Sequence, residues 1–298
     1  MKILLATDGS EYSARAAKFL TRLNLSPDDE IAVFHALYWI PFLYDKEFYY
    51  DTLREIKKDI APKIIDSALD ILKPVHARIS TAIVEGPPEV CIVDAAVKSD
   101  MDMIVMGARG IRGIKSFFVG SVTREVSVRS PRPVLVVKRP VHEKQGGLKV
   151  LFAADGSDYS RATGEFLSKM PLHDDTEIDI LNVMPPEVLD IPETFAPEII
   201  EGMIEVEEKI RKIRLAESER ILEDAGEQLR RRFGNMNVIS EAGDTSSEIL
   251  KAAERLKTDL IAMGCRGLRG IKGMMGSVSR NILTHSECSV LIGKVCGP

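Results

Sequence analysis

The amino-acid sequence predicts an α/β protein of two tandem domains, each a five-stranded parallel sheet with helices on both faces. The first observation is a repeat: KILLATDGS at residues 2–10 returns as KVLFAADGS at 149–157, and MGARG at 106–110 returns as MGCRG at 263–267. The second is that short apolar segments alternate with helical segments in each half, as crossovers between parallel strands require. A length of 298 residues also suits two domains of about 150 residues each.

The repeat sets the domain boundaries that we expect. The first domain covers residues 1–141 and the second covers 148–298, with the polar, glycine-containing segment HEKQGG at 142–147 as the linker. The paired segments keep their order, which indicates a tandem duplication. Such a chain has two related sites, or one working site and one degenerate copy.

Each domain opens with a buried strand. Residues 2–6 are continuously apolar, which is typical of a strand covered on both faces. Ser10 or Ser13 can cap the helix expected over residues 14–23. The same order of elements is expected after residue 149.

The later elements continue the alternation of strands and helices. In the first half we expect strands at 31–37, 77–84, 103–106 and 134–138, and helices ending near Leu72, at 88–98 and from Ser121. In the second half we expect strands at 178–184, 237–241, 260–263 and 290–294, and helices ending near Phe233, at 245–256 and from Ser277.

Composition excludes several classes of protein. Hydrophobic residues at 45% and charged residues at 29% describe a globular chain, and a net charge of −5 argues against a general nucleic-acid binder. No apolar stretch approaches the roughly 18 residues of a membrane span, and the N-terminal apolar run is too short for a signal peptide. A cytoplasmic location with reduced thiols fits the cysteines, which form no C-x-x-C pair: Cys91, Cys265, Cys288 and Cys296.

A glycine-rich loop between the fourth strand and the next helix carries the chemistry. Gly107 and Gly110 are followed by nine residues and then by Gly120 and Ser121. Glycines let a backbone approach a ligand closely, and a helix N-terminus offers free N–H groups that favour phosphate. Ser121 can act both as helix cap and as hydroxyl donor. Positive charge nearby comes from Arg109, Arg112 and Lys115.

Two interpretations of this loop remain open at this point. One is a phosphate site, and the other is a flexible loop that uses glycines for turns, with its basic residues merely solvated. The spacing is that of neither a Walker P-loop nor a G-x-G-x-x-G fingerprint.

The pattern Gly-x₂-Gly-x₉-Gly-Ser after a strand, with Asp-Gly-Ser ending the first strand and Val-Leu-Val-Val as the last, closely resembles the ATP-binding universal stress proteins. The resemblance covers both halves and nearly the whole chain. It implies two Rossmann-like, adenine nucleotide α-hydrolase-like domains with strand order 3-2-1-4-5. The first and fourth strands are then neighbours at a topological switch point, which would bring Asp8 and the loop 107–121 together.

The resemblance also implies ATP with Mg²⁺ as the ligand and assigns residues to it. In the first half the residues beside adenine and ribose are Ala6, Thr7, Asp8, Ala36, Met106 and Gly107, and those around the phosphates are Gly110, Gly120, Ser121 and Val122. The matching residues of the second half are Ala154, Asp155, Val183, Met263, Gly264, Gly267, Gly276, Ser277 and Val278.

One difference separates the two implied sites. Gly267 and Gly276 enclose eight residues, whereas Gly110 and Gly120 enclose nine. A missing residue displaces part of the phosphate cradle by up to about 3.5 Å. We therefore expect the first repeat to be the better ATP site.

The leading functional interpretation is a nucleotide-dependent stress-response regulator, which holds ATP and signals through its own assembly or through a partner that the sequence does not identify. No general base, triad or metal cluster at catalytic spacing is visible, so rapid turnover is not expected. One alternative is a slow ATP hydrolase of the adenine nucleotide α-hydrolase type, in which Asp8 and Mg²⁺ act. The other is a nucleotide-free interaction module, which the intact first loop argues against.

The remaining features receive structural interpretations. His35 is expected as a core or rim histidine, Cys265 as an inert thiol, and Asp8 also as the cap of its own turn. The aromatic segment 38–50 is expected to pack over a sheet edge or the domain interface, with a partner-binding patch as the alternative.

We also expect the two domains to pack as an intramolecular pseudo-twofold pair. The last strands of the two halves are hydrophobic and would be exposed sheet edges if left unpaired. Pairing them covers both edges at once. Further association into a homodimer is an additional expectation.

Overall fold

Ten strands form one continuous sheet in the computed structural model, which describes residues 1–38, 47–110, 119–139, 146–185, 196–268 and 274–295. The strands of the first half are β1 (Lys2–Ala6), β2 (Glu30–Leu37), β3 (Arg78–Glu85), β4 (Met103–Gly107) and β5 (Val134–Val137). Those of the second half are β6 (Lys149–Ala153), β7 (Glu177–Met184), β8 (Asn235–Ala242), β9 (Leu260–Gly264) and β10 (Ser289–Gly293).

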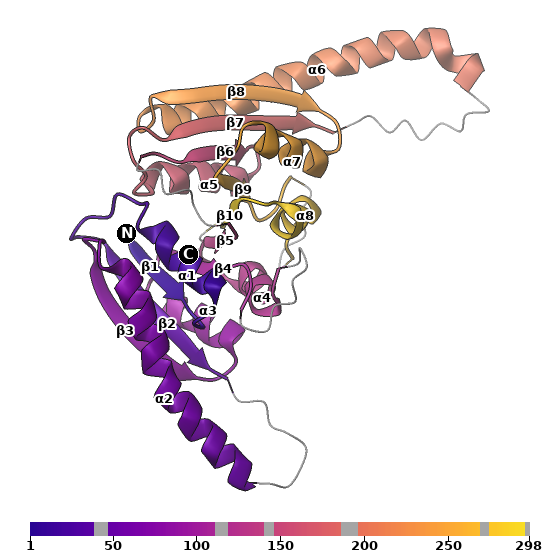
Figure 1. Ribbon diagram of the computed structural model, residues 1–298. Helices are drawn as coiled ribbons and strands as arrows, with labels where there is room; N and C mark the ends of the chain where they lie inside the picture. The colour runs from indigo at the N-terminus through magenta and orange to yellow at the C-terminus, as the bar shows by residue number, and fades with distance from the viewer. Residues whose placement is uncertain (39–46, 111–118, 140–145, 186–195, 269–273, 296–298) are drawn as a thin grey trace.

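The strand order is β3-β2-β1-β4-β5-β10-β9-β6-β7-β8 (Figure 1). Within each half the strands are parallel and follow the order 3-2-1-4-5, which confirms the predicted fold class. Where the halves meet, β5 and β10 pair antiparallel, with Val136 opposite Val290 and Val134 opposite Ile292. The expected pairing of the two last strands is therefore present.

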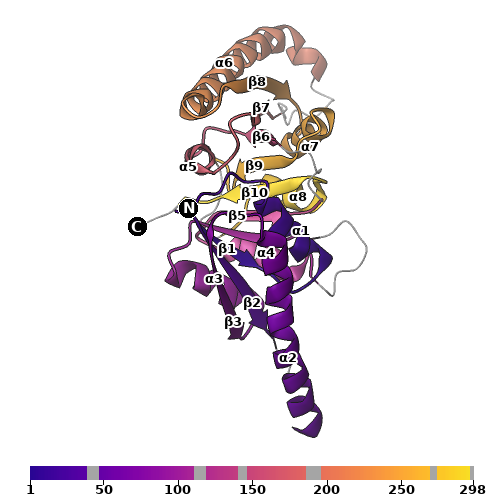
Figure 2. The same ribbon diagram turned by 60° about the vertical axis from the view of Figure 1, so that its left-hand side comes forward.

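Eight helices flank this sheet in the described part of the chain. In the first half they are α1 (Glu11–Leu20), α2 (Glu47–Leu72), α3 (Pro88–Lys98) and α4 (Ser121–Arg129). In the second half they are α5 (Asp158–Lys169), α6 (Ala196–Arg230), α7 (Thr245–Arg255) and α8 (Ser277–His285). The long helices α2 and α6 project beyond the sheet at its two opposite ends (Figures 1 and 2).

The side-chain alternation of the strands divides the core into two layers. In β1, Ile3 and Leu5 face one layer, whereas Leu4 and Ala6 face the other. The first layer is covered by α1, α2, α5 and α6, and the second by α3, α4, α7 and α8. Both layers run through both halves, because the β5–β10 junction continues the sheet without a break.

The first helix begins earlier than the sequence predicts. Helix α1 starts at Glu11 rather than at Ala14, because Ser10 is its N-cap and accepts a hydrogen bond from the Ser13 amide at 3.2 Å. Ser157 caps α5 in the same way through the Ser160 amide, also at 3.2 Å.

Parts of two expectations lie outside the described residues. They are most of the linker (140–145) and much of the aromatic segment (39–46). Within the residues that are described, no helix is long and apolar enough to cross a membrane.

Candidate functional site

The carboxyl ends of β1 and β4 lie side by side, as do those of β6 and β9. Ala6 is in register with Met106, and Ala153 with Met263. The chain leaves β1 through a turn in which Gly9 has φ +78°, and Gly156 has φ +74° at the same point of the second half. Only glycine adopts this left-handed conformation without strain. Both halves therefore carry a sharp turn at the switch point of the sheet, where open α/β sheets bind ligands.

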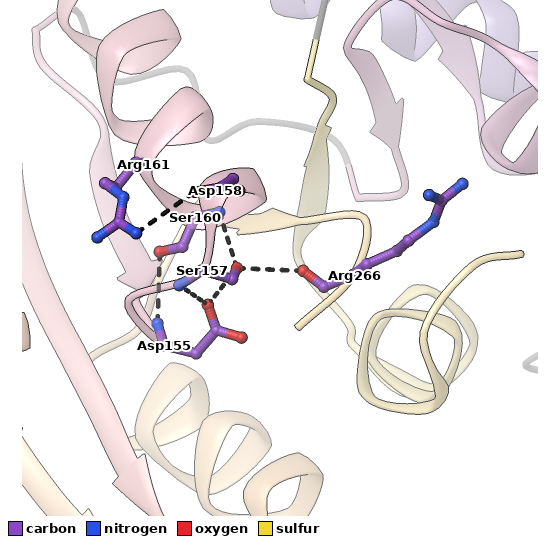
Figure 3. Close-up of polar contacts among 6 residues, drawn as sticks. All are labelled: Asp155, Ser157, Asp158, Ser160, Arg161 and Arg266. Carbon is purple, nitrogen blue, oxygen red and sulfur yellow. Dashed lines mark hydrogen bonds and ion pairs between the residues drawn. The ribbon is translucent and has the colours of Figure 1, made fainter. Parts of the chain in front are cut away.

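The aspartate of each turn fixes the turn itself. Asp8 Oδ1 accepts from the Ser10 amide at 3.1 Å. Asp155 Oδ1 accepts from the Ser157 amide at 3.0 Å and from the Ser157 hydroxyl at 2.6 Å (Figure 3). The expectation that Asp8 caps its own turn is confirmed. The second carboxylate oxygen of Asp155 points away from these bonds (Figure 3).

The same aspartates lie against the glycine loops. A Cβ placed on Gly267 would come within 2.6 Å of Asp155 Oδ2, and one placed on Gly110 would collide with Asp8 Oδ2. The hydroxyl of Ser157 also donates to the carbonyl oxygen of Arg266 at 3.3 Å (Figure 3). The structure thus brings together an aspartate and a glycine loop that are far apart in the sequence, as the strand order predicts.

Each glycine loop ends at the start of a helix that has no side-chain cap. The N-cap of α4 is Gly120, with φ −64° and ψ 157°, and the N-cap of α8 is Gly276, with φ −61° and ψ 155°. This corrects the expected role of Ser121 as cap: Ser121 and Ser277 are the first helical residues, and both are exposed. Because a glycine N-cap has no side chain to accept from the first amides, no N-cap side chain competes with a ligand for those N–H groups.

Hydrogen bonds close the base of each loop in the same way. The Gly120 amide donates to the Ala108 carbonyl at 2.8 Å, and the Gly276 amide donates to the Cys265 carbonyl at 2.9 Å. The Ser279 hydroxyl adds a 2.7 Å bond to the same Cys265 carbonyl. The first and last residues of the loops are therefore placed alike in the two halves, despite the missing residue in the second.

A cavity of about 360 Å³ opens at the loop of the second half. Every residue of the second half that the resemblance assigns to the nucleotide lines it: Ala154, Asp155, Val183, Met263, Gly264, Gly267, Gly276, Ser277 and Val278. Its volume lies within the range of small-molecule sites, roughly 300–1,000 Å³. Apolar strand ends form one part of the wall, and the loop and the start of α8 form the other.

Sequence reasoning missed other residues that line this cavity. They are Ala153, Leu181, Thr245, Ile249, Arg266, Met274, Met275 and Ser279. Thr245 and Ile249 come from the start of α7, after the third strand. The glycine turn before them indicated where the strand ends, but not that the next helix lines the cavity. Leu181 lies two residues before Val183, so the side-chain period of a strand was the signal that could have found it.

The candidate residues of the first half occupy matching places. Ala6, Thr7, Met106 and Gly107 are buried, and Ala36 and Val122 pack against the same core layer as Ala6 and Met106. Asp8 lies at Gly110, as described above, and Gly120 and Ser121 begin α4.

A polar side chain at the end of the second strand supports each turn. His35 is buried, and its Nδ1 lies 2.8 Å from the Thr7 carbonyl oxygen, which it can only meet as a donor. Asn182 donates to the Ala154 carbonyl oxygen at 2.7 Å from the matching position. His35 is therefore a buried histidine that braces the residue before Asp8, in agreement with its structural interpretation.

The arginines that follow the first loop glycines stack on tyrosines. The guanidinium of Arg109 lies 5.4 Å from the ring centre of Tyr12, and that of Arg266 lies 5.0 Å from the ring centre of Tyr159. Arg266 also donates to the Tyr159 hydroxyl and to the Met274 carbonyl, both at 2.6 Å, and so ties the two ends of its loop. Arg112 and Lys115, which were expected to add charge, lie outside the described residues.

The described residues contain no group of three or more histidine, cysteine or acidic side chains that could hold a metal ion. A magnesium ion at this site would therefore depend on the phosphates of a nucleotide, with Asp8 or Asp155 as the nearby carboxylate.

A sheet of this order, with a glycine loop and a helix start at each switch point, defines a Rossmann-like protein with two related candidate sites. The model of the universal stress protein family matches residues 1–138 and again residues 148–294. The chain belongs to the universal stress protein family and carries two copies of its domain.

Individual relatives agree with this assignment. The chain is 32% identical over 143 residues to Universal stress protein MJ0531 of Methanocaldococcus jannaschii, covering 48% of this chain and 84% of that protein. It is 31% identical over 146 residues to Universal stress protein YxiE of Bacillus subtilis, covering 46% and 98%. A solved universal stress protein of Archaeoglobus fulgidus shares the fold over 98% of this chain and 96% of its own, with a TM-score of 0.64 and 23% identity.

Proposed function

We propose that this protein binds adenine nucleotide, ATP with Mg²⁺, at its glycine loops and acts as a nucleotide-dependent regulator in the stress response. The observation that carries the proposal is the cavity of the second half, which ends at the uncapped N-terminus of α8. An apolar compartment suits a base, and the free amides of a helix start suit phosphates. The matching strand ends, aspartate and glycine N-cap of the first half extend the proposal to that repeat.

The assignment of residues follows the two parts of the site. Adenine and ribose would lie against the ends of the first, second and fourth strands of each half. The phosphates would accept hydrogen bonds from the backbone amides of Gly110 and Ser121 in the first half and of Gly267 and Ser277 in the second. Gly120 and Gly276 would border the phosphates, because their own amides already donate to the Ala108 and Cys265 carbonyls. We propose that the first repeat binds more tightly, because its loop has the full nine residues.

Regulation rather than rapid catalysis suits the site. Each site has one aspartate at the loop, and Oδ1 of that aspartate already accepts from its own turn. Among the described residues of the cavity wall there is no histidine, lysine or second carboxylate that could serve as a general base. We propose a cytoplasmic location, which suits the free thiols of Cys91, Cys265 and Cys288, and domains at 1–141 and 148–298.

Ligand release from the purified protein tests the proposal. Mass spectrometry after denaturation should detect adenine nucleotide, and saturating Mg-ATP should raise the melting temperature because it binds only the folded state. A phosphate-release assay on the same sample separates binding from slow hydrolysis. No bound nucleotide, together with no shift of the melting temperature by ATP, would refute the proposal and favour an interaction module.

A further inference from the structure

Two lysines reach across the junction between the repeats. Lys138 follows β5, and its Nζ donates to the carbonyl oxygen of Ser286 at 2.7 Å and to its hydroxyl at 3.0 Å. Lys294 follows β10, and its Nζ donates to the carbonyl oxygens of Ser127 at 2.6 Å and Val128 at 3.4 Å. Ser286 is the C-cap of α8, and Ser127 and Val128 lie in the last turn of α4. Each lysine thus binds the C-terminal end of a helix that belongs to the other repeat.

Both ammonium groups are largely removed from water. Lys294 is 7% exposed, and burial lowers the pKa of Lys294 and lowers that of Lys138 to about 8. Within the described residues, neither lysine has an ion pair with a carboxylate. A buried cation is costly unless it is paired or hydrogen-bonded, and the helix carbonyls supply that compensation here. These two lysines therefore depend on their hydrogen bonds to the helix carbonyls more than a surface lysine would.

The opposite ends of the same two helices form the candidate sites. Helix α4 begins after Gly120, and its last turn accepts hydrogen bonds from Lys294. Helix α8 begins after Gly276, and its C-cap accepts hydrogen bonds from Lys138. A cation at the C-terminus complements the helix dipole, just as an anion does at the N-terminus. A lysine bound at the C-terminal end of a helix and a phosphate bound at its N-terminal end therefore favour each other.

We propose that Lys138 and Lys294 are positioning residues that act across the junction: Lys138 of the first repeat holds α8 for the second site, and Lys294 of the second repeat holds α4 for the first site. The effect on nucleotide binding rests on the proposed function. The effect on the helices themselves does not.

The two lysines differ in one contact. Lys294 Nζ also lies 3.2 Å from the sulfur of Cys265, which is part of the second glycine loop. The residue at that point of the first loop is Ala108: its amide donates to the Val137 carbonyl, as the Cys265 amide does to the Gly293 carbonyl. Alanine offers no polar side chain to Lys138. Among the described residues, Lys138 therefore makes hydrogen bonds only to the helix of the second site and meets the first loop only through charge repulsion with Arg109. Lys294 touches the helix of the first site and the loop of the second.

Site-resolved titration with Mg-ATP tests this pattern. With the first site blocked by Gly120→Asp, Lys138→Met should raise the Kd of the second site by roughly three- to tenfold, as expected for a charge lost at a helix end. With the second site blocked by Gly276→Asp, Lys138→Met should not weaken the first site, because Lys138 meets the described part of the first loop only through repulsion with Arg109. Lys294→Met should weaken both sites, but in a Cys265→Ala background it should weaken only the first.

The matched control is Lys149→Met. It removes the same charge from a lysine at the start of β6 that is 46% exposed and pairs with Glu177 at the start of β7, away from both loops. It should change neither Kd. If Lys138→Met does not fold, Ser286→Ala removes one of its two contacts and should give a smaller effect in the same direction.

Hydrogen exchange without nucleotide separates this inference from the proposed function. Lys138→Met should speed exchange in the last turn of α8 and leave α4 unchanged, while Lys294→Met should speed exchange in α4. Equal weakening of both sites by Lys138→Met, or unchanged affinity at both, would overturn the inference. If the parent protein binds no ATP, the proposed function fails, and unchanged exchange in α8 of Lys138→Met would then overturn the positioning role as well.

Discussion

Oδ2 of Asp155 lies 2.6 Å from the point that a Cβ on Gly267 would occupy. The aspartate belongs to the turn after β6 and the glycine to the loop after β9, so this approach joins the two segments that form the candidate site. Only a residue without a side chain allows it. The same relationship holds between Asp8 and Gly110 in the first repeat.

Gly267→Ala should therefore destabilise the protein. Asp155 is a short side chain held by Ser157, so it has little freedom to move away from an added methyl group. We expect a loss of about 1–3 kcal/mol in the free energy of unfolding, as for other overpacked positions, measured by denaturant titration. The control is Gly226→Ala in α6, where a Cβ meets nothing closer than 4.0 Å and a helical alanine is favoured. Equal stability of Gly267→Ala and Gly226→Ala would contradict the close approach.

The hydrogen bond of His35 can be tested by substituting the residue that occupies the matching position of the second repeat. Asn182 makes the matching bond in the second half, so His35→Asn should keep a donor for the Thr7 carbonyl. His35→Leu removes that donor and leaves a buried carbonyl unpaired, at a cost of about 1–3 kcal/mol. In thermal unfolding, His35→Asn should have a higher melting temperature than His35→Leu. The reverse order would show that packing, and not the hydrogen bond, decides this position.

The β5–β10 junction should be sensitive to proline. Val136 lies opposite Val290 in the antiparallel pair and in register with Met106 on its other side. Val136→Pro removes an N–H and should uncouple the halves, so that calorimetry resolves two unfolding transitions in place of one. Val136→Ala, which shortens the side chain but keeps the N–H, should leave a single transition. An unchanged cooperative transition in Val136→Pro would argue against the junction.

Lys138 and Cys288, two partly buried side chains beside this junction, predict a dependence of stability on pH. Burial lowers the pKa of Lys138 from 10.5 to about 8, so the unfolded chain binds more protons between these values and stability rises with pH. Burial raises the pKa of Cys288 from 9.0 to about 11, so this thiol makes stability fall with pH over its own range. The two effects oppose each other above pH 9.

Removing the Cys288 thiol should make the contribution of Lys138 to the pH dependence of stability measurable. In a Cys288→Ala protein, the free energy of unfolding should rise by roughly 3 kcal/mol between pH 8 and 10.5, relative to a Cys288→Ala, Lys138→Met double variant. Denaturant titrations across this range measure the difference. A flat difference would show that Lys138 is not desolvated.

Most of the strands and helices could be predicted from the sequence, because each apolar run marks its own element and the repeat shows each element twice. The strand order came from the family resemblance, and it placed Asp8 beside Gly110 correctly. The cap of α4 was misassigned because Ser121 and Gly120 are adjacent, and only the backbone angles show which one precedes the helix. The place of Thr245 in the cavity wall and the contacts of Lys138 and Lys294 with the other repeat arise from packing between distant elements. No periodicity or motif in a single sequence indicates such packing.

Substitution of the glycine N-cap tests most directly whether the amides at the start of these helices hold ATP phosphates. A Cβ on Gly120 would meet nothing closer than 3.5 Å, so substitution there is tolerated sterically. Aspartate is a good N-cap, and in Gly120→Asp it would accept from the amides that should bind phosphate and add a negative charge. Gly120→Ala leaves those amides free and is the matched control.

The decisive measurement is calorimetric titration of Mg-ATP into the wild type, Gly120→Asp, Gly120→Ala and Gly276→Asp. We expect Gly120→Asp to lose affinity at the tighter site by on the order of a hundredfold, a difference of about 2.7 kcal/mol, while Gly120→Ala stays near the wild type. Gly276→Asp should have the smaller effect on total binding, because the second loop lacks one residue. Normal ATP affinity in Gly120→Asp, with affinity lost in Gly276→Asp, would contradict the assignment of the tighter site to the first repeat and make the second repeat the working site.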